Sequence, residues 1–249
     1  MKTRIVITDL TRMYHGHVCL AGYTGNRCCV RPVLKQKGIS ERSLYLDNGR
    51  IITPFSVVDL ELLEPDPQPP HTEDVLFREG SFNFIRMVND RKSVLGWSLF
   101  KNVEDIFEQE IQSGPGYFVI DCRGPRSLGT ISSLEIHEVR YEMGMEGVWD
   151  YRLCFYDGSN QYYRLKITDL TWQYYCNHLK DEKNTPIDVA RRITEDLKKR
   201  EIYLRIGLAR GWKKFPERCY LQITGIYTFP DYLEGKNFSL FKSAPDSEG

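Results

Sequence analysis

The amino-acid sequence predicts a mostly β protein built from two similar halves. Short β-prone runs separated by Gly and Asn turns occur in both halves, and aromatic residues are plentiful, with 15 Tyr, 12 Phe and 4 Trp. Residues 151–156 and 161–167 flank an Asp-Gly turn, which is the strongest hairpin signal in the chain. The 249 residues are enough for two domains of about 100–150 residues each.

The expected elements are distributed as follows. Strands are expected at residues 4–8, 18–23, 27–32, 55–63, 117–120, 134–141, 151–156, 161–167, 203–208 and 219–227. Helices are expected at residues 93–111, near 170–181 and near 186–200, the last beginning at Pro186.

A break in the chain at Gly114-Pro115-Gly116 divides these elements into two groups. We therefore expect an N-terminal domain at residues 1–112 and a C-terminal domain at 113–241. The polar residues 242–249 are expected to form a disordered tail.

One five-residue sequence occurs twice. Residues 7–11 and 167–171 both read Ile-Thr-Asp-Leu-Thr, and later runs resemble one another in the same order. This order favours an internal repeat of the two halves. The Thr and Asp side chains of the motif are expected to accept hydrogen bonds from backbone N–H groups of the following turn, not to catalyse a reaction.

Several short motifs resemble those of the bacterial dual OB-containing domain family. They lie at residues 5–11, 29–32, 69–74, 128–131, 163–169, 206–210 and 219–223. The resemblance spans roughly residues 3 to 230 and implies two tandem OB-like five-stranded barrels with a few helices. OB barrels often bind single strands or oligosaccharides on one face. No functional residue is carried over from the family.

The strongest candidate site is a basic segment in a chain whose net charge is zero. Residues 189–218 contain ten basic and four acidic residues, and a loop at 210–215 interleaves aromatic rings with cations. Cations hold the phosphates of a single strand and flat rings stack on its bases. The candidate nucleic-acid-binding residues are Arg205, Arg210, Trp212, Lys213, Lys214, Phe215 and Arg218, with Arg27, Arg31, Arg123 and Arg126 as an extension.

Two interpretations of this loop stay open. Either the rings and cations face solvent together, or Trp212 and Phe215 pack beneath the loop while the lysines face water. On the first interpretation, charge reversal at Lys213 and Lys214 weakens binding and flattens its salt dependence.

No motif for catalysis is recognisable. The sequence lacks a Gly-x-Ser-x-Gly elbow, a His-Glu-x-x-His helix and a phosphate-binding Gly-Lys-Ser/Thr loop. His15, His17 and Cys19 could ligate a metal, but a fourth ligand is not evident, so no metal is expected. We expect a non-catalytic module without a cofactor that binds single-stranded DNA or RNA, or a nucleotide, as an accessory or sensor unit of a bacterial system.

Two other functions stay open. The acidic, Pro-rich residues 59–74 and the many tyrosines would suit a protein-interaction module, and an enzyme acting on nucleic acid is the third possibility. The seven cysteines are expected to be reduced thiols of a cytoplasmic protein. No apolar stretch approaches the roughly 18 residues of a membrane span, so no membrane partner is expected.

Overall fold

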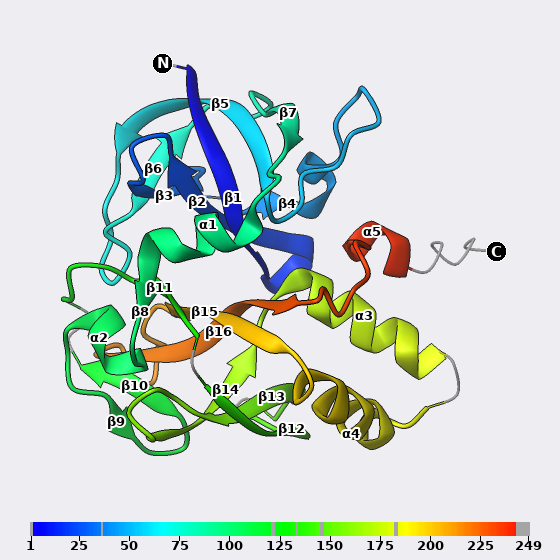
Figure 1. The fold of residues 1–249 in the computed structure, drawn as a ribbon. Coiled ribbons are helices and arrows are strands. Elements are labelled where there is room, and N and C mark those ends of the chain that lie inside the picture. The colour runs from blue at the N-terminus through cyan, green and yellow to red at the C-terminus, as the bar shows by residue number, and fades with distance from the viewer. Residues whose placement is uncertain are drawn as a thin grey trace.

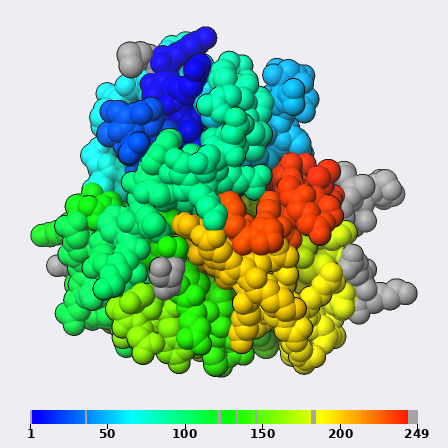
Figure 2. Space-filling model, viewed as in Figure 1, coloured from blue at the N-terminus to red at the C-terminus, as the bar shows by residue number. Residues whose placement is uncertain are grey.

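The computed structural model describes residues 2–35, 37–120, 123–132, 134–144, 147–181 and 184–242. Two β structures lie one against the other, the first coloured blue to cyan and the second green to orange in Figure 1. The space-filling view shows the same two lobes packed together (Figure 2). The expected tail, apart from Lys242, falls outside the described residues.

The first half is a closed five-stranded barrel of the OB type. Its strands are β1 (Lys2–Arg12), β2 (His17–Thr24), β3 (Cys29–Val33), β5 (Ser56–Pro65) and β6 (Asp74–Phe77). They pair in the order β1-β2-β3-β6-β5, with β3 parallel to β6, and β5 returns to β1 to close the barrel. The short strands β4 (Ile39–Ser40) and β7 (Asn83–Met87) pair with β2 and β5.

The second half has the same strand order but is not closed in the described part of the chain. Its strands are β12 (Glu135–Met143), β13 (Trp149–Tyr156), β14 (Tyr162–Ile167), β16 (Arg218–Phe229) and β15 (Glu201–Leu208). The β14–β16 pair is parallel, as in the first barrel. β15 pairs with β11 (Leu128–Ile131), which leaves the outer edge of β12 without a strand.

Helix α4 (Pro186–Leu197) covers that open edge. Its apolar face, which includes Val189 and Ile193, is buried, and the Thr194 hydroxyl accepts a hydrogen bond from the Val139 amide of β12 at 2.7 Å. The helix begins as the sequence predicted, with Pro186 in its first turn and a capping box between Thr185 and Asp188. The second half is therefore an open OB-type sheet in which a helix replaces one strand contact.

The remaining elements connect and flank these sheets. They are the helices α1 (Arg91–Leu95), α2 (Val103–Phe107), α3 (Leu170–Asp181) and α5 (Phe238–Phe241), the 3₁₀ turns η1 (Tyr14–Gly16), η2 (Glu41–Leu44) and η3 (Gly96–Ser98), and the strands β8 (Leu99–Phe100), β9 (Gln112–Ser113) and β10 (Tyr117–Ile120). β8 and β10 join the second sheet through β11 and β16.

The single helix predicted at residues 93–111 is wrong. Two short helices occupy this stretch because each has its own start signal: Asp90 accepts from the Ser93 amide, and Asn102 accepts from the Asp105 amide. Two hydrophobic cores result, one inside the first barrel and one that begins at Val103. The boundary near residue 112 stays a prediction.

The two Thr-Asp-Leu-Thr sequences do not occupy equivalent positions. Residues 7–11 belong to the first strand of the first barrel, whereas residues 167–171 join the third strand of the second sheet to α3. The proposed repeat is therefore wrong as aligned. The two copies instead meet, because the Arg12 amide donates to the Thr168 carbonyl at 2.9 Å. Asp169 caps α3 through the Thr171 and Trp172 amides, as the sequence predicted.

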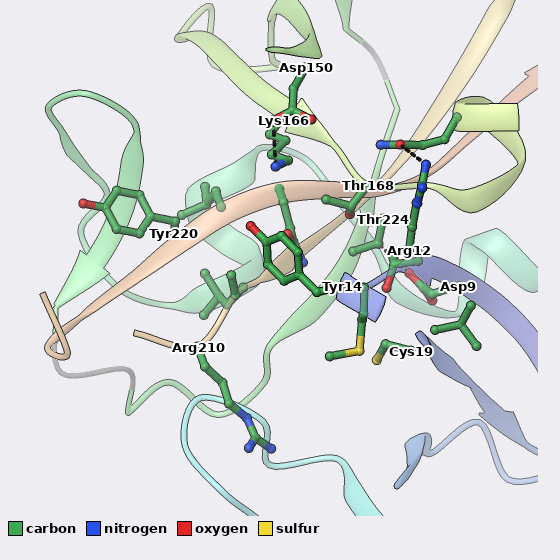
Figure 3. Close-up of a pocket in the computed structure, with 18 of the residues that line it drawn as sticks. Asp9, Arg12, Tyr14, Cys19, Asp150, Lys166, Thr168, Arg210, Tyr220 and Thr224 are labelled. Atoms are coloured by element: carbon green, nitrogen blue, oxygen red, sulfur yellow. Dashed lines mark hydrogen bonds and ion pairs between the residues drawn. The ribbon is translucent and has the colours of Figure 1, made fainter. Parts of the chain in front are cut away.

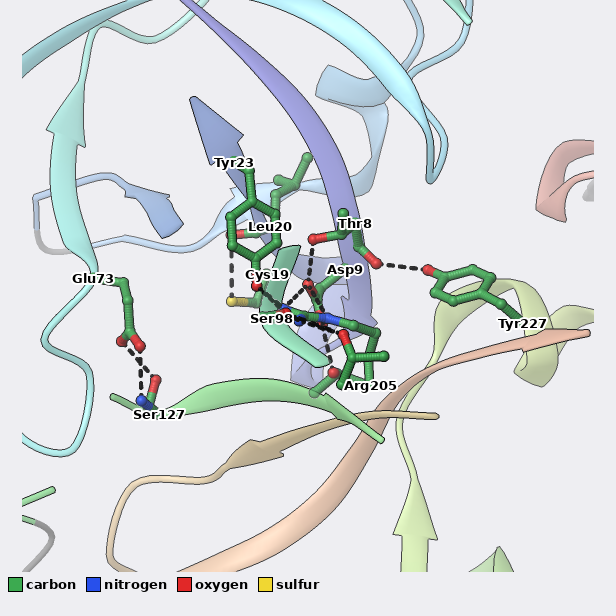
Figure 4. Close-up of polar contacts among 12 residues, drawn as sticks. Thr8, Asp9, Cys19, Leu20, Tyr23, Glu73, Ser98, Ser127, Arg205 and Tyr227 are labelled. Carbon is green, nitrogen blue, oxygen red and sulfur yellow. Dashed lines mark hydrogen bonds and ion pairs between the residues drawn. The ribbon is translucent and has the colours of Figure 1, made fainter. Parts of the chain in front are cut away.

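Asp9 forms the central polar contact between the two lobes. The guanidinium of Arg205 on β15 donates to both Asp9 oxygens at 2.8–3.1 Å, and Arg205 is 0% exposed (Figure 4). The Thr224 hydroxyl also donates to Asp9, at 2.6 Å. Burial opposes the charge on Arg205, but Asp9 and Tyr23 hold its pKa well above the ordinary value.

Five of the seven cysteines follow expectation, and Cys122 lies outside the described residues. Cys19, Cys28, Cys29, Cys154 and Cys176 are free thiols. Cys219 is disulfide-bonded, so the expectation that it is reduced was wrong. In the part of the chain that the structure covers, no helix is both long and apolar enough to cross a membrane.

Replacing Arg205 should strongly destabilise the protein. Arg205→Met leaves Asp9 charged and buried without its cation, which typically costs about 3–5 kcal/mol. Chemical denaturation monitored by circular dichroism measures this loss. The matched control is Arg4→Met, which breaks the exposed pair with Asp59 at 2.8 Å and should change stability little.

The double variant Asp9→Asn/Arg205→Met tests the cause of the loss. It removes both charges, so it should be more stable than Arg205→Met alone. Equal stability of Arg205→Met and the Arg4→Met control would contradict an energetic role for this pair.

Candidate nucleic-acid interface

A groove of about 1250 Å³ lies between the two lobes. OB barrels present ligands to their second and third strands and to the loops that join strands 1–2 and 4–5. Here these parts of both lobes line one cavity: β2, β3, the 13–16 loop and His71 from the first, and β13, β14, Gly144, Val148 and the 209–217 loop from the second. The two binding faces are therefore directed at one another (Figure 3).

Among the charged residues that line the groove, cations predominate. Its described lining includes nine Lys or Arg residues but two acidic residues, Asp9 and Asp150. The first barrel contributes Arg12, Arg31 and Lys37. The second lobe contributes Arg152, Arg164, Lys166, Lys180, Arg210 and Lys213. Because the whole chain has zero net charge, this excess is a local property of the groove.

Acidic partners hold several of these cations in place. Lys166 pairs with Asp150 at 2.8 Å, Arg152 pairs with Glu142 at 2.9 Å, and Arg210 pairs with buried Asp74 at 2.8 Å. Arg210 nevertheless remains exposed. The cations are thus oriented before any ligand binds, although each pair lowers the charge that a phosphate would meet.

Aromatic rings stand around the same groove. Tyr14, Trp149 and Trp212 line it and are 67%, 52% and 38% exposed. Trp149 stacks on Tyr141 with ring centroids 5.3 Å apart. Large exposed rings beside cations are the arrangement that stacks bases while phosphates are neutralised.

The structure brings three of the predicted residues to the groove. Arg210, Trp212 and Lys213 line it, on the loop between β15 and β16. A hydrogen bond from the Phe215 amide to the Trp212 carbonyl, 2.8 Å long, turns this loop back on itself. Exposure of Trp212 excludes the interpretation in which this ring packs beneath the loop.

Phe215 and Arg218 pack against one another at the C-terminal end of the 209–217 loop. The Arg218 guanidinium lies 4.3 Å from the Phe215 ring centroid and 4.8 Å from that of Phe118. Lys214 lies 5.7 Å from the Phe215 ring and is not among the residues that line the groove. For Phe215 the packed interpretation therefore fits the structure better.

Four other candidates lie elsewhere or are occupied. A contact between Arg205 and a ligand is excluded by its complete burial against Asp9, so that prediction was wrong. Arg31 lines the groove, but it is buried and paired with Asp74. Arg27 lies over Trp97 at 5.7 Å, and Arg126 pairs with Glu108 at 2.8 Å.

Arg123 is the remaining candidate of the extension. It is exposed but is not among the residues that line the groove. Of the four residues of the extension, Arg31 alone lines the groove with the 209–217 loop, and it is buried against Asp74.

Sequence reasoning missed the cations on β13 and β14. In β14, Arg164 and Lys166 alternate with the buried Leu165 and Ile167, so the two cations share the outer face. The hairpin itself was predicted, and this alternation was the signal that could have identified its basic face. Arg12 and Tyr14 carry no comparable signal, because their place at the groove depends on packing between the lobes.

The C-terminal end of the acidic segment 59–74 is buried. His71, Glu73 and Asp74 are buried against the second lobe. Glu73 accepts from the Ser127 amide at 2.7 Å and from the Ser127 hydroxyl at 2.8 Å. The Ser127 hydroxyl therefore accepts from Nδ1 of His71, 3.1 Å away, which places a proton on Nδ1.

Burial sets the protonation of His71. Desolvation, reinforced by the charges of Arg31 and Arg210, lowers its pKa to about 2. Folded His71 is therefore neutral at neutral pH.

The order of strands, the parallel third and fifth strands and the paired binding faces describe two OB units in one chain. The sequence profile of the dual OB-containing domain matches residues 3–226. The chain belongs to the dual OB-containing domain family. A search of the curated proteins finds no match.

Membership of the dual OB-containing domain family accounts for the fold but assigns no ligand. Across the described residues, no group of three or more His, Cys, Asp or Glu side chains could hold a metal ion. His15 lies in the η1 turn with φ 58°, whereas His17 and Cys19 lie on β2, so the three side chains do not share one strand.

The stability of this dual OB-containing domain should fall in acid partly through His71. The unfolded imidazole gains a proton below about pH 6.5, whereas the folded one, with a pKa of about 2, does not. The stability that His71 contributes is therefore complete above pH 6.5 and is lost as the pH falls. The stability of the wild type minus that of His71→Asn should drop by about 2 kcal/mol between pH 7.5 and 5.

Urea denaturation at several pH values measures this difference. Asparagine can still donate a hydrogen bond to Ser127, and His137→Asn is the control because His137 is exposed. A wild-type-minus-variant difference that stays constant with pH would contradict the neutral, buried imidazole.

Proposed function

We propose that this dual OB-containing domain is a non-catalytic module that binds single-stranded DNA or RNA, or a nucleotide, in the groove between its lobes. One observation carries the proposal. Two OB binding faces meet across a cavity lined by nine cations and by exposed aromatic rings, in a chain of zero net charge. Its role would be that of an accessory or sensor unit of a bacterial system.

Electrostatics and stacking support this ligand together. Cations on both walls can neutralise successive phosphates, and the affinity then depends on salt through the counterions that are released. Tyr14, Trp149 and Trp212 offer faces on which any base can stack, without a requirement for one sequence. An acidic or apolar ligand would use one of these features, whereas a polynucleotide uses both.

The protein-interaction alternative loses part of its basis. The C-terminal end of the acidic segment, at Glu73 and Asp74, is buried between the lobes and is paired with Ser127 and Arg31. What remains for a protein partner is the exposed Pro-rich stretch before it and the tyrosines of the surface.

Charge reversal at the groove should weaken binding and its salt dependence. Arg12→Glu/Lys213→Glu places one reversal on each wall, at two exposed side chains. The logarithm of the affinity for labelled oligothymidylate or oligouridylate should then vary less with the logarithm of salt concentration. Each lost phosphate contact lowers this slope by about 0.7, so the decrease should be about 1.4 or more. Fluorescence anisotropy across a salt series measures it.

The control is Lys198→Glu/Lys199→Glu. It makes the same change of net charge at two exposed lysines that do not line the groove. The same loss of affinity in both variants would show that overall charge, and not the groove, governs binding. Absence of binding by the unaltered protein at low salt would reject the proposal and leave the protein-interaction alternative.

A further inference from the structure

We propose that a single strand spans both lobes at once, with bases stacked on Tyr14 of the first barrel and on Trp149 and Trp212 of the second lobe. This inference rests on the proposed function and specifies its ligand as an oligonucleotide. The three rings come from three separate segments, namely the η1 turn, the start of β13 and the 209–217 loop, so no single loop accounts for them.

The size of the groove supports a ligand longer than a mononucleotide. Pockets for small molecules and cofactors commonly measure about 300–1,000 Å³. The groove measures about 1250 Å³ and continues from the first barrel to the second lobe without a dividing wall. A mononucleotide would leave most of its cationic lining unused.

The loop that carries Tyr14 holds this ring outward. His15 and Gly16 adopt left-handed backbone angles, with φ of 58° and 69°, and the Met13 amide closes the loop on the His17 carbonyl at 2.8 Å. His15 is not a glycine, so this conformation costs free energy and is unusual. In Figure 3, Tyr14 projects into the same cavity that Lys166, Arg210 and Tyr220 line.

Lys and Arg side chains lie near these aromatic rings on both walls of the groove. Arg12 lies two residues before Tyr14, and Lys213 directly follows Trp212, while Arg164 and Lys166 line the second lobe between the other contacts. A strand stacked on the rings would therefore find a cation for its phosphates on each lobe.

Two ion pairs between the lobes fix the two walls of the groove relative to one another. Asp9 of the first barrel is bound to Arg205 of the second lobe, and Asp74 of the first barrel is bound to Arg210 of the 209–217 loop. Because the walls are fixed, a strand held by one lobe meets the other at high effective concentration. Affinity should therefore rise steeply with length until the strand reaches both lobes.

Oligothymidylates of increasing length test the inference. Labelled strands of about 3, 6, 9 and 12 nucleotides begin below the roughly 4–16 nucleotides that one OB unit occupies and extend into that range. We expect weak binding of the shortest, a steep rise with length, and one 12-nucleotide strand per protein chain by native mass spectrometry. Tyr14→Ala and Trp212→Ala should each weaken binding of the longest strand by about 5- to 150-fold.

Two variants separate stacking from other effects. Tyr14→Phe keeps the ring and should bind almost as tightly as the unaltered protein. Tyr45→Ala removes another exposed tyrosine of the first barrel that does not line the groove, and it should leave affinity unchanged.

The outcomes distinguish this inference from the proposed function. Binding at no length would overturn both. Equal affinity for 3 and 12 nucleotides, two long strands per chain, or unchanged affinity in Tyr14→Ala would overturn the shared strand while leaving nucleic-acid binding in place.

Discussion

The buried pair between Asp9 and Arg205 is the contact on which the arrangement of the two lobes depends. A guanidinium with no exposure must be satisfied completely, and here Asp9 takes one side of it while Tyr23, Ser98 and Thr130 accept from the other. Such geometry is available in one relative orientation of the lobes. Replacement of a buried pair by apolar residues is often neutral or stabilising, whereas removal of one partner is costly, so any arrangement that separates Asp9 from Arg205 is strongly penalised. Since the groove has one wall from each lobe, the pair also sets the width of the groove.

A second set of charges explains how a neutral protein presents a cationic groove. Asp74 lies behind the cations, where it binds both Arg31 and Arg210, and Glu142 binds Arg152 in the same way. These carboxylates fix the guanidinium groups and balance their charge without facing the ligand. A phosphate that enters the groove therefore meets hydrogen-bond donors that are already oriented. The positive electrostatic potential there is weaker than unpaired arginines would produce.

The sequence predicted most strands and two of the helices, because alternation, the Asp-Gly turn and the Pro186 start are local signals. It could not predict the site to the same extent. The sequence analysis grouped Arg205 with Arg210 and Lys213, because the number of charges along a segment does not show which face of a strand each side chain occupies. Its partner lies 196 positions away, so only tertiary packing reveals it. The sequence also could not predict that β12 and β15 do not pair to close the second barrel. That outcome depends on α4, which is distant in the sequence and packs against β12.

A buried carboxyl near the contact between the lobes, that of Asp169, changes stability with pH in the opposite direction to His71. Burial raises the pKa of Asp169 to about 7, although three backbone amides oppose the shift and Asp9 adds to it. Between its ordinary value of 3.8 and about 7, folded Asp169 keeps a proton that the unfolded chain has lost, so its contribution to stability falls as the pH rises. His71 contributes less as the pH falls below 6.5. Because the two trends oppose each other over roughly pH 4–6.5, the stability of the intact protein changes less with pH than either group requires. The two contributions partly cancel in the wild type, so the effect of His71 is isolated by the difference in stability between the wild type and His71→Asn.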